Sequence, residues 1–109
     1  METTRIVGQG VGPSGPEGRG SDEVRDRLHG MWEAVAPAWG EYADFVDAGA
    51  ASVTAKMLEL AAPHPGERVL ELACGPGGVG LAAAKMVAPG GEIVLSDVVA
   101  AMTSIADTA

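Results

Sequence analysis

The spacing of apolar residues changes along the chain and predicts a helical first half followed by a mixed second half. Through residues 21–62 apolar side chains recur every three or four positions, which places them on one face of a helix. Three helices are expected, the first capped by Ser21 and ending near Pro37, and the third ending before Pro63. Their apolar positions are Val24, Leu28, Met31, Trp32 and Val35, then Trp39, Tyr42, Phe45 and Val46, then Val53, Met57, Leu58 and Ala61.

Two short apolar runs in the second half, residues 68–72 and 92–96, are typical of buried parallel strands. Residues 79–87, rich in Ala and Leu, predict a helix between them, which completes a strand, loop, helix, strand unit. Residues 100–109 have helical spacing again. We expect this last helix to lead to a third strand, and the sequence contains none after it.

The first 20 residues differ from the rest in composition. Residues 8–20 hold six Gly and two Pro and almost no side chain able to pack, so they do not offset the entropy of their own ordering. We therefore divide the chain into a disordered tail at 1–20, N-terminal helices at 21–62 and a first βαβ unit at 63–109.

Length and charge narrow the class of protein. With 109 residues the chain forms at most one compact domain. A net charge of −8 with only seven Lys and Arg disfavours a nucleic-acid substrate. The single cysteine, Cys74, allows no intrachain disulfide, and no apolar run has the length of a membrane span. We expect a soluble, cytoplasmic protein.

The candidate chemistry lies in the glycine-rich turn after the first strand. Gly75, Gly77 and Gly80 satisfy G-x-G-x-x-G, a spacing shared by several nucleotide-binding proteins. Asp97 directly follows the second strand, 20 residues beyond Gly77, where an acid can accept both hydroxyls of an adenosine ribose. The two features together predict a nucleoside site.

Two residues of this segment argue against a dinucleotide. Pro76 has no N–H to donate to a pyrophosphate, and Glu71 would add a negative charge close to one. S-adenosyl-L-methionine has no phosphate, and it carries sulfonium and ammonium charges that a carboxylate suits. These residues favour it as the cofactor.

The run Val69-Leu-Glu-Leu-Ala-Cys-Gly-Pro-Gly-Gly-Val79 resembles the first motif of class I S-adenosylmethionine-dependent methyltransferases, and Ser96-Asp-Val-Val-Ala-Ala-Met102 resembles the second. The stretch from Met31 to Ala106 is most similar to the ubiquinone and menaquinone biosynthesis branch. The resemblance implies an α/β fold, here an incomplete Rossmann-like methyltransferase fold with N-terminal helices and the first βαβ unit.

The resemblance also implies roles for individual residues. The acid matching Glu71 orients the amino-acid end of the cofactor, and the acid matching Asp97 binds the ribose. The segment Ala73, Cys74, Gly75, Pro76 and Gly77 lines the cofactor through its backbone, and Val98 and Met102 flank the adenine. Two departures stand out: Ala73 replaces a usual Gly, which is tolerated if φ stays negative, and Val99-Ala100-Ala101 replaces a more polar stretch.

Each feature also has a plainer interpretation. Glu71 alone could be a strand-end acid paired with Arg68. Cys74 has no His partner nearby in sequence, which disfavours a catalytic nucleophile. His29 and His64 are isolated, so no metal is predicted. The aromatic residues of the helices are expected to pack between them, although the resemblance would let Trp39 or Tyr42 cover the cofactor.

The leading hypothesis is a methyltransferase that acts on a small organic acceptor, with no catalytic residue assignable in this chain. In the family, most acceptor-binding residues follow later strands, so we expect the isolated chain to be inactive unless it associates with itself or with a chain that completes the sheet. Two alternatives stay open: a non-catalytic fragment or regulatory partner of a complete methyltransferase, and an NAD(P)-binding oxidoreductase fragment.

Overall fold

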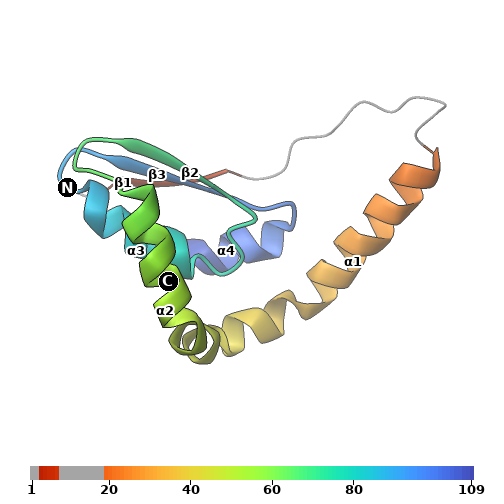
Figure 1. Ribbon diagram of the computed structural model, residues 1–109. Coiled ribbons are helices and arrows are strands. Elements are labelled where there is room, and N and C mark those ends of the chain that lie inside the picture. Colours follow the sequence, from red (N-terminus) through yellow and green to blue (C-terminus); the bar gives the residue numbers. More distant parts are fainter. Residues whose placement is uncertain (1–2, 8–18) are drawn as a thin grey trace.

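A computed structural model describes residues 3–7 and 19–109 and shows an α/β arrangement, in which the described part has four helices and a three-stranded sheet (Figure 1). The elements are β1 (Thr3–Val7), α1 (Arg19–Glu41), α2 (Ala43–Ala61), β2 (Arg68–Leu72), α3 (Gly78–Val87), β3 (Glu92–Ser96) and α4 (Ala100–Thr108). This architecture is compatible with part of a Rossmann-like fold. Within the described residues, none of the helices is long and apolar enough to cross a membrane.

All three strands are parallel, in the order β1-β3-β2. The two strands predicted from the apolar runs are confirmed with the same bounds. In the register, Val94 at the centre of β3 lies between Arg5 of β1 and Leu70 of β2. The carboxyl ends of β2 and β3 therefore meet at one edge of the sheet, where α/β folds bind their ligands.

The third strand comes from the start of the chain. Residues 3–7 form β1, so the prediction of a disordered tail is wrong for these five residues. Four of the five, Thr3, Thr4, Ile6 and Val7, are β-branched, and such residues favour strands when a neighbouring strand supplies hydrogen bonds. Residues 1–2 and 8–18 of the predicted tail lie outside the described residues.

One face of the sheet is covered by α3. Ile93 and Leu95 of β3 are fully buried and pack with Ala83, Ala84 and Val87 of that helix. The small alanine side chains allow the helix and the sheet to approach closely. The opposite face carries Leu70 and Leu72, which are 60% and 72% exposed. The expected association of the chain with itself, or with a chain that completes the sheet, stays a prediction.

The N-terminal helices are two, not the predicted three. α1 begins before Ser21, so this residue is not its N-cap, and it continues through Pro37 to Glu41. The chain leaves helical geometry only at Tyr42, inside the segment expected as the second helix, so Trp39 belongs to α1. From Ala43 to Ala61 α2 then runs unbroken and joins the rest of that segment to the expected third helix. Packing accounts for the continuity at Pro37, because its neighbours on α1 are held against α4.

The contact between α1 and α4 forms a second small core. Ala36 is fully buried with Val99 and Met102, and Trp39 packs against them. His29, which precedes Ala36 on the same helix, hydrogen-bonds through Nε2 to the carbonyl oxygen of Val98 at 3.0 Å. These contacts hold α1 beside the loop that follows β3.

Candidate functional site

A cavity of about 450 Å³ lies at the carboxyl ends of β2 and β3 and is bounded by α1 and α2. This volume is within the range of sites for small ligands. Its wall consists of Trp32, Trp39, Ala43, Val46, Asp47, Ala50, Thr54, Ala73, Cys74, Gly75, Pro76, Gly78, Val79, Asp97, Val98 and Met102. Among the described residues, the charged members of this wall are two carboxylates, and none is Lys, Arg or His.

The glycine-rich turn forms the floor of the cavity through its backbone. Gly75 and Gly77 have φ of 54° and 95°, values that only glycine adopts without strain. Ala73 has φ of 55°, so the condition of a negative φ, under which alanine is tolerated here, is not met. The turn is held by hydrogen bonds from the Cys74 N–H to the Ser96 carbonyl oxygen and from the Gly77 N–H to the Cys74 carbonyl oxygen. The alanine is therefore kept in a strained conformation by its neighbours.

Asp97 joins the turn after β2 to the turn after β3. Its Oδ2 accepts the Gly75 N–H at 2.9 Å, and its Oδ1 accepts the Val99 N–H at 2.9 Å. An ionised carboxylate has about four lone-pair positions, so these two bonds leave one on each oxygen. The remaining positions suit two adjacent hydroxyl donors, the pair that a ribose presents.

Glu71 lies beside the cavity and is absent from its wall. It is level with Leu95 in the register and faces α3, where a Cβ added at Gly80 would overlap its carboxylate. Burial raises the pKa of Glu71, and the nearby Gly80 amide lowers this pKa again in part. Its Oε2 is buried without a hydrogen-bond partner among the described residues.

The plainer interpretation of Glu71, an ion pair with Arg68, is wrong. Residues three apart in a strand face opposite sides of the sheet, and Arg68 instead pairs with Glu92 at 2.7 Å. The carboxylate of Glu71 instead lies against Gly80 in the first turn of α3. Orientation of a ligand's amino-acid end by Glu71 stays a prediction.

Cys74 is buried, and the carboxylates of Asp97 and Glu71 lie close enough to affect its thiol. Burial, with the negative charges of Asp97 and Glu71, raises the pKa of the Cys74 thiol to about 11. The thiol is consequently protonated at neutral pH, and a protonated thiol is a poor nucleophile. This agrees with the interpretation of Cys74 as a small buried side chain of the wall.

Asp47 is a member of the wall that sequence reasoning missed. It lies on α2, and a Cβ added at Gly78 would meet both of its carboxylate oxygens. The carboxylate thus stands against the first residue of α3, and it has no hydrogen bond or ion pair within residues 3–7 and 19–109. A local signal exists: Asp47 is the charged position in a helical stripe of small or apolar residues made by Ala43, Val46, Ala50 and Thr54.

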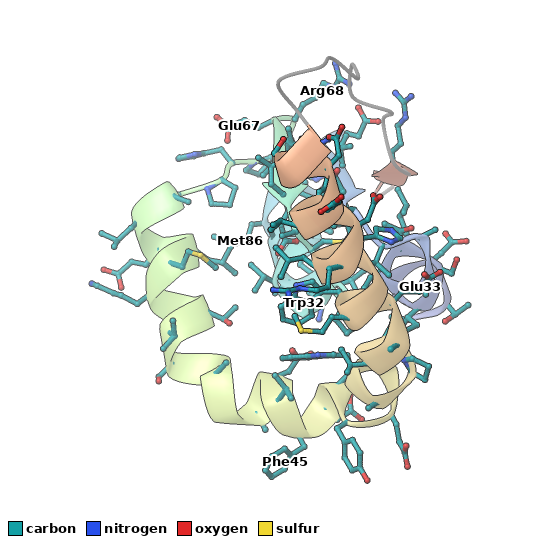
Figure 2. All side chains as sticks on the ribbon, turned by 90° about the vertical axis from the view of Figure 1, so that its right-hand side faces the viewer. Trp32, Glu33, Phe45, Glu67, Arg68 and Met86 are labelled. Atoms are coloured by element: carbon teal, nitrogen blue, oxygen red, sulfur yellow. The ribbon has the colours of Figure 1, made fainter. Side chains whose placement is uncertain are left out.

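The aromatic residues of the helices divide into two groups. Trp32 and Trp39 line the cavity with ring centroids 6.4 Å apart, and Figure 2 shows Trp32 on α1. Tyr42 and Phe45 are 57% and 79% exposed, and Phe45 points away from the body of the protein (Figure 2). The prediction that these two pack between helices is wrong, because both side chains are exposed at the junction of α1 and α2.

The structure brings seven of the nine predicted cofactor-binding residues to the cavity: Ala73, Cys74, Gly75, Pro76, Asp97, Val98 and Met102. Glu71 and Gly77 are adjacent to it and absent from its wall. The role of each as a ligand contact stays a prediction. Among the described residues, no group of three or more His, Cys, Asp or Glu is placed to hold a metal ion.

Comparison with known proteins gives a distant relationship to a methyltransferase. The chain is similar to the 2-phytyl-1,4-naphtoquinone methyltransferases of two Synechococcus strains, S. elongatus PCC 7942 and Synechococcus sp. PCC 6301. In each case identity is 30% over 82 residues, which are 74% of this chain and 35% of the relative. The chain thus spans about a third of the length of these relatives. No protein-family model and no solved structure matches it.

Proposed function

We propose that the cavity binds S-adenosyl-L-methionine and that the chain is the cofactor-binding portion of a class I methyltransferase. The proposal is supported by the distant methyltransferase relatives and by the residues that surround the cavity. The acceptor of the methyl group is proposed to be a small organic molecule. The relatives, whose name specifies a naphthoquinone, act on a molecule of this kind.

One observation favours this cofactor over a dinucleotide: the carboxylate of Asp47 stands at the N-terminus of α3. In dinucleotide sites the pyrophosphate occupies the helix N-terminus that follows the glycine turn. Here a pyrophosphate would meet a carboxylate, a proline without an N–H at position 76 and, in the part of the wall that the structure describes, no basic side chain. A cofactor with cationic groups and no phosphate is compatible with all three.

The residues present suit such a ligand from one end of the cavity to the other. Asp97 would hold the ribose hydroxyls, Val98 and Met102 would flank the base, and Gly78 on α3 would adjoin the amino-acid end. When bound, the cofactor supplies an electrophilic methyl group on a sulfonium. The chain contributes by positioning it and by excluding water with Trp32 and Trp39, and positioning alone lowers the barrier of a displacement substantially.

Calorimetric titration tests this assignment. S-adenosylhomocysteine and NAD are titrated separately into the purified chain at the same ionic strength. We expect saturable heat with S-adenosylhomocysteine and at least tenfold weaker binding of NAD. Tighter binding of NAD would replace the methyltransferase assignment with that of a nicotinamide-dependent oxidoreductase.

A further inference from the structure

Asp47 gives the cavity wall a second carboxylate in addition to that of Asp97. The two acids come from separate parts of the chain, Asp47 from α2 and Asp97 from the turn directly after β3. They contact the glycine-rich segment at different residues, Asp47 at Gly78 and Asp97 at Gly75. Asp97 already accepts two backbone N–H groups, whereas Asp47 has no partner in the described part of the chain. A carboxylate without such a partner, in a wall whose described residues include no basic side chain, is a counter-ion available to a ligand.

We infer that Asp47 binds the α-ammonium of the cofactor's amino-acid end and so selects ligands that carry this charge. The inference rests on the proposed function, in which Asp97 would hold the ribose and Gly78 would adjoin the amino-acid end. Gly78 is the residue against which the Asp47 carboxylate stands. An ammonium there would form a charge-assisted hydrogen bond with Asp47, roughly twice as strong as a neutral one.

The absence of a side chain at Gly78 makes this arrangement sterically available. The Asp47 carboxylate occupies the space that a Cβ at position 78 would fill, so any larger residue would displace it. Displacement is cheap for the fold, because Asp47 is exposed and at the end of a flexible side chain. Gly78→Ala is therefore a second way to move the carboxylate without removing it.

Three ligands that share the adenosyl group separate the role of Asp47 from that of the rest of the cavity. S-adenosylmethionine and S-adenosylhomocysteine carry the α-ammonium, and 5′-methylthioadenosine lacks the amino-acid end altogether. Each is titrated into the wild-type chain, Asp47→Asn, Gly78→Ala and the control Asp44→Asn. Asp44 is an exposed acid on the same helix that is absent from the cavity wall, so its substitution makes the same change in net charge.

We expect Asp47→Asn to weaken both ammonium-bearing ligands by about threefold to tenfold and to leave methylthioadenosine unchanged. Gly78→Ala should produce the same selective loss, and Asp44→Asn should match the wild type. Equal affinities of Asp47→Asn and wild type for all three ligands, or an equal loss for all three, would overturn the role of Asp47. Failure of the wild type to bind any of the three, with binding of NAD, would instead overturn the proposed function.

Discussion

The Asp97 carboxylate accepts the backbone N–H of Gly75 at 2.9 Å and thereby connects two turns that are separated in sequence by the whole of α3. The same side chain holds the start of α4 through the Val99 N–H. Asp97 consequently has a structural role in the free protein and, in the proposed function, a binding role toward the ribose. A substitution there should reveal both.

Asp97→Asn is expected to lower stability and ligand affinity together. An amide has one acceptor oxygen, so either the Gly75 N–H or the Val99 N–H would face an NH2 group without an acceptor. Leaving such a donor unsatisfied costs about 1–3 kcal/mol, and each 1 kcal/mol corresponds to a fall in Tm of about 4–8 °C in a domain of this size. Thermal unfolding, monitored by circular dichroism, measures the fall in Tm. Asp107→Asn, at an exposed position of α4, is the control and should keep the wild-type Tm.

Ala73→Gly is expected to stabilise the protein. The left-handed backbone at Ala73 costs an alanine about 1–2 kcal/mol, and glycine escapes most of this cost while adding entropy to the unfolded chain. The net gain in the free energy of unfolding should be about 1 kcal/mol, measured by urea denaturation.

Two further alanines provide the comparison for Ala73. Ala62 has φ of 48° and is absent from the cavity wall, so Ala62→Gly should give a similar gain without changing ligand affinity. Ala55 lies in the middle of α2, where Ala→Gly should cost about 1 kcal/mol. If Ala73→Gly destabilised the protein as much as Ala55→Gly does, the strain assigned to the turn would be absent.

The desolvated carboxyl of Glu71 predicts a particular dependence of stability on pH. Because the folded-state pKa is raised above 4.5, the folded protein binds this proton more tightly than the unfolded chain. The free energy of unfolding therefore falls as pH rises from about 4.5 through the raised pKa. The Glu71→Gln protein should not lose stability in this way, because an amide does not titrate.

At pH 7 the Glu71→Gln protein should have the higher Tm, by a few degrees, and the difference should narrow toward pH 4. Scanning calorimetry from pH 4 to pH 8 measures it. Glu41→Gln, at an exposed position, is the control, and its difference from the wild type should vary much less with pH. A wild type more stable than Glu71→Gln at pH 7 would mean that an unseen partner compensates the buried oxygen.

Cys74 is expected to react slowly with alkylating reagents. With a pKa of about 11 in place of 9.0, the thiolate fraction at pH 8 is lower by about 100-fold, and only the thiolate reacts. The rate of labelling by iodoacetamide, measured by mass spectrometry, should be about 100-fold lower in native buffer than in denaturant. Equal rates in the two buffers would show that the thiol is neither buried nor close to the two acids.

The parts of the fold that the sequence predicted are those with a strong local pattern. The strands β2 and β3 are apolar runs, and the segments rich in Gly and Pro beside them form turns. This pattern specifies both strands and the glycine turn without help from distant residues. The continuation of α1 through Pro37 depends on burial of Ala36 against α4, a contact between segments far apart in the sequence. β1 was missed because the Gly and Pro content of residues 8–20 dominated the interpretation of the first 20 residues.

The residues of the candidate site also divide into those with a local signal in the sequence and those without one. Asp97 and the turn from Ala73 to Pro76 were found through motif spacing, and the structure places them around one cavity. Asp47 was not found, because its importance comes from the position of α2 over Gly78, which no local pattern encodes. The positive φ of Ala73 also has no local signal, since the hydrogen bonds that hold the turn override the preference of alanine.

The two tryptophans allow the most direct test of the central claim, that this cavity takes an adenosyl cofactor. Trp32 and Trp39 are the only tryptophans of the chain, and both line the cavity. In a ¹H–¹⁵N spectrum, addition of S-adenosylhomocysteine should shift both indole N–H signals saturably, and NAD at the same concentration should shift them far less. Indole signals that do not respond to S-adenosylhomocysteine, or that respond first to NAD, would contradict the claim.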